Sequence, residues 1–232
     1  MTPELRAAID SLYAMSAREG GRRDVHGCPC CVSDADRRKL HGAPLRQLDA
    51  EALGHYAFKA MTTWGDEHDF RYFLPRIVEL VVDRSLWVDP ETAIGKLAYA
   101  KWPEWPARDR EIVSAFLDAW WHAGAIGEVV TPSVALSTYL ESGGDLERAL
   151  RHWDAWLATH APARVAMLDA ICTLSHEGSL SPWTPRAASE RIAHWLLADE
   201  RRAHLDRAIA FESDEPDRHA DERDALAMRS RR

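Results

Sequence analysis

The chain has 232 residues, a formal net charge of −8, and 46% hydrophobic and 28% charged residues, a composition typical of a soluble globular protein. The negative charge argues against a nucleic-acid partner, because phosphate binding normally requires a basic face. The N-terminus is charged from Glu4 onward without an apolar signal core, and no apolar run approaches the roughly 20 residues of a membrane span. We therefore expect a cytoplasmic protein without a membrane partner.

The chain opens with two predicted helices separated by a polar loop. Thr2 and Pro3 form a cap and first-turn pair that predicts a helix from residue 3 to about residue 18. The loop GGRRDVHGCPCCVSD follows, and the spacing of Ser33 and Asp36 predicts the cap of a short second helix.

Residues 48–83 predict a central helical hairpin, the strongest local pattern in the chain. Apolar side chains recur at three- and four-residue spacing in both halves, as expected for two helices that each bury one face. Gly65 can end the first helix in a left-handed conformation and Asp66 can cap the second, which predicts a one-residue corner. Pro75 lies inside the second helix and is expected to kink it, at a cost of about 3 kcal/mol unless packing offsets it.

Helical periodicity continues after the hairpin, and no strand pattern interrupts it. Further helices are expected at about 89–101, 107–123, 131–141, 145–157, 162–174 and from 184 onward, the last bending or dividing across DERRAH. The sequence thus predicts an all-α fold of about nine helices, stacked as antiparallel hairpins in a bundle or a short HEAT-like solenoid. Residues 1–211 are expected to form one helical domain, and residues 212–232 a disordered charged tail.

Ten tryptophans are an unusual number for this length. Most are expected to fill space between helices. Those between Trp102 and Trp121 are expected to be half exposed in part and to line a groove. Cys172, on an apolar helix face, is expected to be a buried small hydrophobic residue.

The loop HGCPCC at 26–31 is the first candidate site. Cys28 and Cys31 form a C-P-x-C pair, a spacing at which two thiolates can hold one Zn²⁺ ion. His26 and His41 could complete a tetrahedral site, with Cys30 as an alternative ligand. Two other interpretations stay open, free thiols with packing roles and a redox-active or disulfide-forming pair. A thioredoxin-like role is disfavoured, because the βαβ pattern that accompanies such a motif is missing.

The polar residues His55, Asp66, Glu67, His68 and Asp69 form a second candidate group at the corner of the hairpin. Carboxylates beside histidine can bind metal or exchange protons, but a helix start already accounts for the three acidic residues. We therefore favour capping over catalysis here. Phosphate-loop, HExxH, GxSxG and GxGxxG motifs are absent.

The segment CPCCV followed by PLRQLDAEALGHYAFKAMTTWGDEHDFRYFLPRIVEL resembles an uncharacterised bacterial family. That family has a CPxC-type loop followed by a hairpin with the phrases YAFKA(L/M)TTWG and DF(K/R)xFLPRILEL. The match covers roughly residues 26–83. The resemblance implies that loop and hairpin act as one unit, and it implies no activity or catalytic residue.

The sequence favours binding over catalysis. Because it has an acidic surface, abundant helix-packing aromatics and no catalytic motif, we expect a helical binding or scaffold protein that presents a groove to a protein or peptide partner. A basic partner would suit the acidic charge. The alternative is a zinc-binding protein or metalloenzyme that uses the HGCPCC loop.

Overall fold

The structure is a computed structural model that describes residues 1–182 and 184–214, and this part of the chain is all helical. Within it lie eleven α-helices, three short 3₁₀ helices and no strand, so the all-α prediction is confirmed and the count of about nine is too low. The last predicted helix does divide, with a 3₁₀ turn at Asp199–Arg201. The helices are α1 Pro3–Glu19, α2 Asp34–Leu40, α3 Ala50–Lys59, α4 Glu67–Val82, α5 Pro90–Tyr99, α6 Ala107–Ala125, α7 Pro132–Glu141, α8 Leu146–Leu157, α9 Ala161–Glu177, α10 Arg186–Leu196 and α11 Arg202–Asp214, with η1 Leu45–Gln47, η2 Trp102–Glu104 and η3 Asp199–Arg201.

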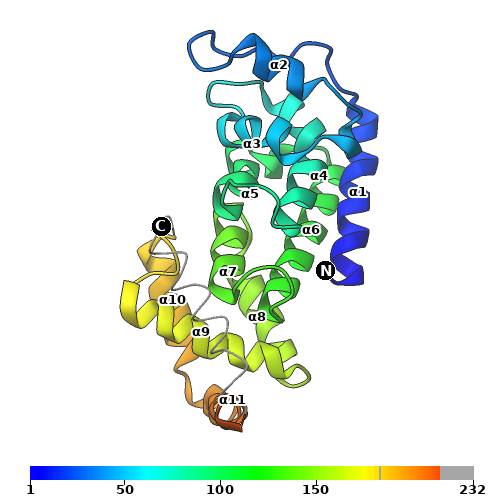
Figure 1. The fold of residues 1–232 in the computed structure, drawn as a ribbon. Coiled ribbons are helices and arrows are strands. Elements are labelled where there is room, and N and C mark those ends of the chain that lie inside the picture. The colour runs from blue at the N-terminus through cyan, green and yellow to red at the C-terminus, as the bar shows by residue number, and fades with distance from the viewer. Residues whose placement is uncertain (183, 215–232) are drawn as a thin grey trace.

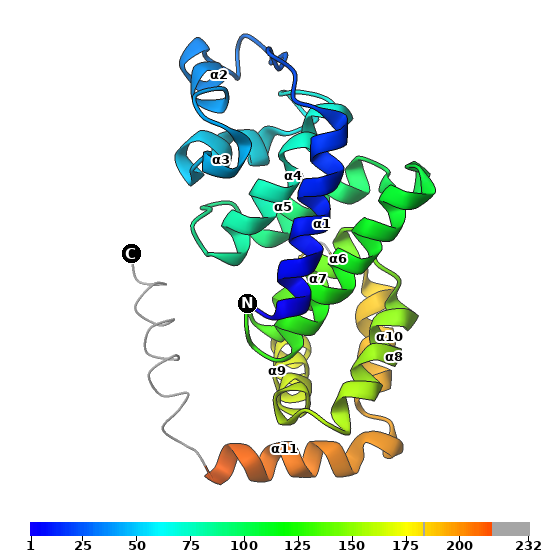
Figure 2. The same ribbon diagram turned by 90° about the vertical axis from the view of Figure 1, so that its right-hand side faces the viewer.

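The molecule is elongated, with α2 at one end and α9 to α11 at the other (Figure 1). The long helix α1 runs across α4 and α6 (Figure 2). Other elements separate α1 from both of these helices in the sequence. This crossing differs from a simple succession of stacked hairpins. Buried apolar side chains from Leu5 to Leu196 nevertheless form one continuous core.

The corner of the hairpin is longer than predicted. Helix α3 ends at Lys59, and the next residues form an irregular turn in which Met61 and Gly65 have positive φ angles of 60° and 68°. The one-residue corner was wrong because Ala60 and Trp64 are buried in the turn itself and so continue the apolar spacing of the helix. Asp66 caps α4 as predicted.

Helix α4 runs through Pro75 without ending. Proline cannot bond to the carbonyl four residues earlier, and its ring crowds the preceding turn. In that turn the carbonyl of Tyr72 accepts a hydrogen bond from the buried Ser16 hydroxyl of α1, at 2.7 Å. The α1 side chain therefore stabilises the turn that proline weakens.

The tryptophans mostly fill the core, as expected. Six of those in the described residues are buried: Trp64, Trp105, Trp120, Trp121, Trp153 and Trp195. Between Trp102 and Trp121, only Trp102 is half-buried, so the prediction of exposure was wrong for Trp105, Trp120 and Trp121. Trp183 lies outside the described residues.

Two sequence expectations concern the membrane and the C-terminal tail. No described helix is long and apolar enough to cross a bilayer. Helix α11 extends to Asp214, three residues into the segment expected to be disordered, and residues 215–232 lie outside the described part of the chain.

Candidate functional site

The cysteine loop is fixed to the corner between α3 and α4. The backbone N–H of Cys28 donates to the carbonyl of Thr63 at 2.8 Å, and that of Gly65 donates to the carbonyl of His26 at 2.7 Å. Gly27 forms an isolated bridge with Trp64 between these two bonds. The loop is thus held on a helical support by its own main chain.

The tight turn of the loop brings three thiols together. The carbonyl of Cys28 accepts from the N–H groups of Cys31 and Val32, both at 2.9 Å. The Cys28 and Cys30 sulfur atoms are 2.9 Å apart, and those of Cys30 and Cys31 are 3.5 Å apart. All three sulfur atoms lie within 4.8 Å of one another, and all three cysteines are free thiols.

Hydrogen bonds among these thiols shift the pKa values of Cys28 and Cys30 in opposite directions. Hydrogen bonds from the thiol and then the backbone N–H of Cys30 lower the pKa of Cys28 from its ordinary value, and Cys31 adds to the effect. The hydrogen bonds with Cys28 and Cys31 raise the pKa of Cys30 to about 11. Negative charge therefore gathers first on Cys28, in the thiolate form that binds metals.

The predicted ligand set is only partly brought together. Cys28 and Cys31 lie close, as the C-P-x-C spacing predicted, and Cys30 joins them as a full member of the group. His26 and His41 are exposed and lie outside it. Cys172, expected to be buried, is exposed on α9, because the apolar stripe of that helix is narrower than its sequence indicates.

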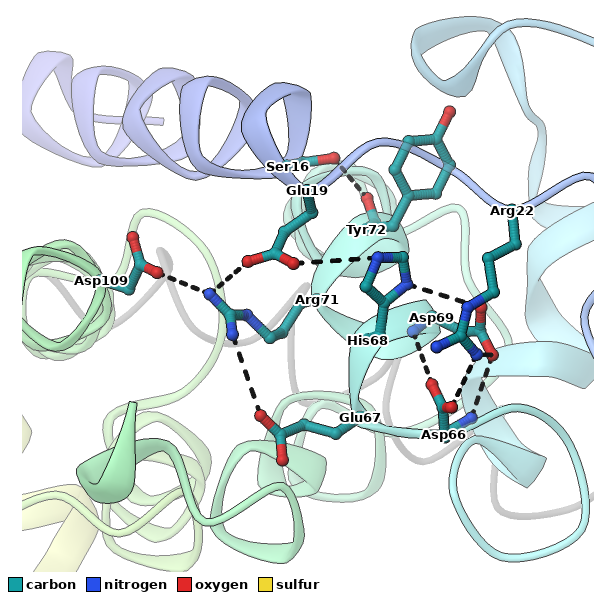
Figure 3. Close-up of polar contacts among 10 residues, drawn as sticks. All are labelled: Ser16, Glu19, Arg22, Asp66, Glu67, His68, Asp69, Arg71, Tyr72 and Asp109. Carbon is teal, nitrogen blue, oxygen red and sulfur yellow. Dashed lines mark hydrogen bonds and ion pairs between the residues drawn. The ribbon is translucent and has the colours of Figure 1, made fainter. Parts of the chain in front are cut away.

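The polar corner beneath the loop is an ion-pair network (Figure 3). Arg22 donates to Asp66 at 2.6 Å and to the buried Asp69 at 3.2 Å. Asp66 and Asp69 also exchange the two hydrogen bonds of a capping box at the start of α4. The ligand atoms of Asp66, His68 and Asp69 lie within 4.8 Å of one another, but the guanidinium of Arg22 already supplies the positive charge that a cation would bring.

The pKa values of two carboxyl groups at this corner, those of Asp66 and Asp69, are shifted in opposite directions. Partial burial opposes the effect, but hydrogen bonds from Arg22 and the Asp69 backbone lower the pKa of Asp66 below its ordinary value. Burial and the charge of Asp66 raise the pKa of Asp69. These shifts fit a capping pair held by one arginine, which agrees with the interpretation favoured from the sequence.

Arg71 forms the other half of the network in Figure 3 and joins three helices. Its guanidinium lies 2.5 Å from Glu19 of α1 and 2.5 Å from Asp109 of α6, and it stacks over the ring of Trp105 at 4.5 Å. His68 is 3.9 Å from Glu19. The predicted polar group is split, since His55 pairs with Asp36 at 3.4 Å.

Several buried polar atoms around the corner make no hydrogen bond. They are the hydroxyls of Tyr56 and Thr63 and the indole nitrogen of Trp64. Nδ1 of His68 and Oδ1 of Asp69 also lack a hydrogen bond but form an ion pair at 3.9 Å. Unpaired buried polar groups are rare, and each costs free energy.

A separate open groove of about 600 Å³ lies along η2, α6 and α8. Trp102 and Pro103 form one part of its wall, and Arg110, Asp118 and Arg148 are among its polar residues. The indole nitrogen of Trp102 donates to the carbonyl of Ser142 at 2.8 Å, which fixes the ring. Of the tryptophans expected to line a groove, Trp102 alone lies in the wall of this one.

No family model, curated protein or solved structure matches the chain. The family resemblance inferred from the sequence stays a prediction. Function must therefore be argued from the chemistry of the site.

Proposed function

We propose that this protein binds a soft metal ion through Cys28, Cys30 and Cys31, zinc being the ion expected from the loop. The observation that supports this proposal is the position of three thiol sulfur atoms within 4.8 Å of one another. Around a tetrahedral zinc ion with Zn–S bonds near 2.3 Å, sulfur ligands are about 3.8 Å apart. The thiols need only small side-chain rotations to reach that spacing.

The helices serve as the rigid support of this site. Metal sites need ligands that are held close to their bound positions before the ion arrives. Here the main-chain bonds from Cys28 to Thr63 and from Gly65 to His26 hold the loop on the corner. Arg22 then holds that corner through Asp66 and Asp69.

Metal titration of reduced protein, purified without an affinity tag, tests the proposal. One equivalent of Co²⁺ should bind with sulfur-to-metal charge-transfer absorption, and Zn²⁺ should displace it. The Cys28→Ser/Cys31→Ser variant should lose this signal, whereas Cys172→Ser, which removes an exposed thiol elsewhere, should keep it. Binding of Co²⁺, Zn²⁺ and Cu(I) each below about 0.2 equivalents, unchanged in the double variant, would contradict the proposal.

The second candidate function is partner binding by a helical scaffold, which the groove at Trp102 favours. Trp and Arg side chains carry much of the energy of protein interfaces, and Trp102, Arg110 and Arg148 line this groove. The acidic net charge of −8 favours a partner that is basic overall.

Affinity capture from cells that produce the protein tests this second function. A specific partner should be lost with Trp102→Ala, which alters the groove, and retained with Trp87→Ala, which removes a highly exposed ring elsewhere. It should also be retained by the Cys28→Ser/Cys31→Ser variant. Equal capture by the Trp102→Ala variant would contradict a role for the groove.

A further inference from the structure

We infer that the thiol site is a three-sulfur site with Cys30 as its third ligand and an open fourth position, suited to a thiophilic ion of the cuprous class. This inference rests on the proposed metal binding and specifies its ligand set and ion. It differs from the mixed cysteine and histidine site that the sequence predicts.

Cys30 occupies the centre of the cluster. Its sulfur lies 2.9 Å from that of Cys28 and 3.5 Å from that of Cys31. The side chain is exposed, whereas its two neighbours are half-buried. An ion bound by Cys28 and Cys31 would therefore lie within reach of Cys30 and on the solvent side of the turn.

The main chain at each of the two histidines has a fixed place in the fold. The carbonyl of His26 is bonded to the N–H of Gly65, and His41 is the C-terminal cap residue of α2. Both side chains are exposed and outside the sulfur group. The three sulfur atoms therefore form their group without either imidazole.

The two carboxylates that follow the loop in sequence, Asp34 and Asp36, already have partners. Asp36 accepts hydrogen bonds from Ser33, as part of the cap of α2, and pairs with His55. Asp34 pairs with Arg37. Among the described residues, the group that holds the three sulfurs includes no carboxylate or imidazole.

This ligand set favours a cuprous ion over a structural zinc ion. A structural zinc ion takes four protein ligands in a tetrahedron, and here a fourth is missing from the group. Thiolates are soft ligands that bind Cu(I) strongly, and a monovalent d¹⁰ ion is well satisfied by three of them. The open position faces solvent at Cys30, so an incoming thiol could take the ion by ligand exchange.

Competition titrations and X-ray absorption on the anaerobic, reduced, full-length protein test the inference. Cu(I) is measured against bathocuproine disulfonate, and Zn²⁺ against a chromophoric chelator. We expect one Cu(I) ion with three sulfur neighbours and no nitrogen neighbour. Cys30→Ser should lower the Cu(I) affinity at least about 10-fold. His26→Ala, His41→Ala and Cys172→Ser should each leave it within about twofold, and circular dichroism should show that each variant is folded.

The other outcomes distinguish failure of the three-sulfur site from failure of metal binding itself. A four-coordinate zinc ion with a nitrogen neighbour that is lost in His26→Ala or His41→Ala would overturn the three-sulfur site and leave metal binding intact. Full Cu(I) affinity in the folded Cys30→Ser variant would also overturn it. Absence of any cysteine-dependent binding of either ion would overturn both this inference and the proposed function.

Discussion

Two buried tyrosines show how much the partner of a single hydroxyl matters in this molecule. Tyr13 donates to Glu79 at 2.7 Å, and burial followed by this carboxylate raises the pKa of Tyr13. Tyr56 is fully buried, and its hydroxyl makes no hydrogen bond. Burial and the nearby charge of Asp69 raise the pKa of Tyr56 as well. The two residues therefore offer a matched comparison of a paired and an unpaired phenol.

Tyr56→Phe should leave the free energy of unfolding unchanged or raise it by about 1 kcal/mol, because it removes a polar group that is desolvated without a partner. Tyr13→Phe should lower it by about 1–2 kcal/mol, because it removes a hydrogen bond to a carboxylate. Urea denaturation of both variants measures the difference. If Tyr56→Phe proved the more destabilising change, the Tyr56 hydroxyl would have a partner such as an internal water.

The part of the candidate site that could be predicted from the sequence is the part set by local spacing, and the rest depends on tertiary contacts. The pairing of Cys28 with Cys31 depends on spacing along the chain, so the sequence predicted it and the structure brings them together. The position of His26 depends on where the loop meets Gly65, and that of His41 on where α2 ends, and the cysteine spacing encodes neither. Cys30 was treated as an alternative because adjacent cysteines cannot be ranked without the turn that orients them.

At the scale of helices, two glycines predict opposite effects of adding one methyl group. A Cβ at Gly124 of α6 would lie 2.0 Å from the Cβ of Ala135 in α7. A Cβ at Gly95 of α5 would meet nothing nearer than 3.9 Å. Gly124 thus permits the close approach of α6 and α7, whereas Gly95 has no such role.

Gly124→Ala should lower the free energy of unfolding by about 1–3 kcal/mol, because the two helices must move apart. Gly95→Ala should raise it by about 0.5–1 kcal/mol, because alanine favours a helix interior. Both values come from chemical denaturation, with helix content checked by circular dichroism. Equal effects of the two substitutions would show that α6 and α7 do not pack as described.

Helix starts were predicted better than helix ends. The caps at Thr2, Ser33 and Asp66 are local patterns, and in the structure each accepts the expected backbone hydrogen bond. The end of α3 was misplaced because burial of Ala60 and Trp64 in a turn resembles burial on a helix face. Periodicity reports which residues are buried and does not by itself report the backbone between them.

At the scale of the whole molecule, the packing of α1 on α4 and α6 could not be predicted from local patterns, because its contacts join residues that are far apart in the sequence. Arg71 contacts Glu19 and Asp109, which are 52 and 38 residues away in the sequence. Its side chain is only 12% exposed. Local sequence spacing does not predict such a contact, whereas the periodicity of apolar residues does predict the all-α class.

Arg71→Met should lower the free energy of unfolding by about 2–4 kcal/mol, because it leaves the partly buried carboxylates of Glu19 and Asp109 with less compensation. Arg191→Met is the control, because Arg191 makes a similar pair with Glu147 on an exposed surface, and it should cost less than about 1 kcal/mol. Thermal and urea denaturation give both values. A cost for Arg71→Met as small as that of the control would mean that the network does not hold the three helices together.

The stability of the molecule should depend on pH through His122 of α6, which contacts Trp156 of α8 and His160 just before α9. Burial, followed by the nearby His160, lowers the pKa of His122 below its ordinary value of 6.5, with Glu4 opposing and His152 adding to the effect. Its ring packs against that of Trp156, with the centroids 4.7 Å apart and the planes tilted by 45°, and Nε2 is buried without a hydrogen bond. Because the folded state binds this proton less readily than the unfolded state, the stabilisation is complete above about pH 6.5 and is lost as pH falls below it.

His122→Phe keeps an aromatic ring against Trp156 and removes the titrating group, so it should reduce the loss of stability between pH 7 and pH 5. The raised pKa values of Asp118 and Glu141, caused first by burial, work in the opposite direction, since protonation of these acids favours the folded state. Both proteins carry these two acids, so their effect cancels when the variant is compared with the natural chain. Urea midpoints measured at half-unit steps of pH for both proteins give the comparison. The same slope with pH in the variant as in the natural chain would assign the loss to another group.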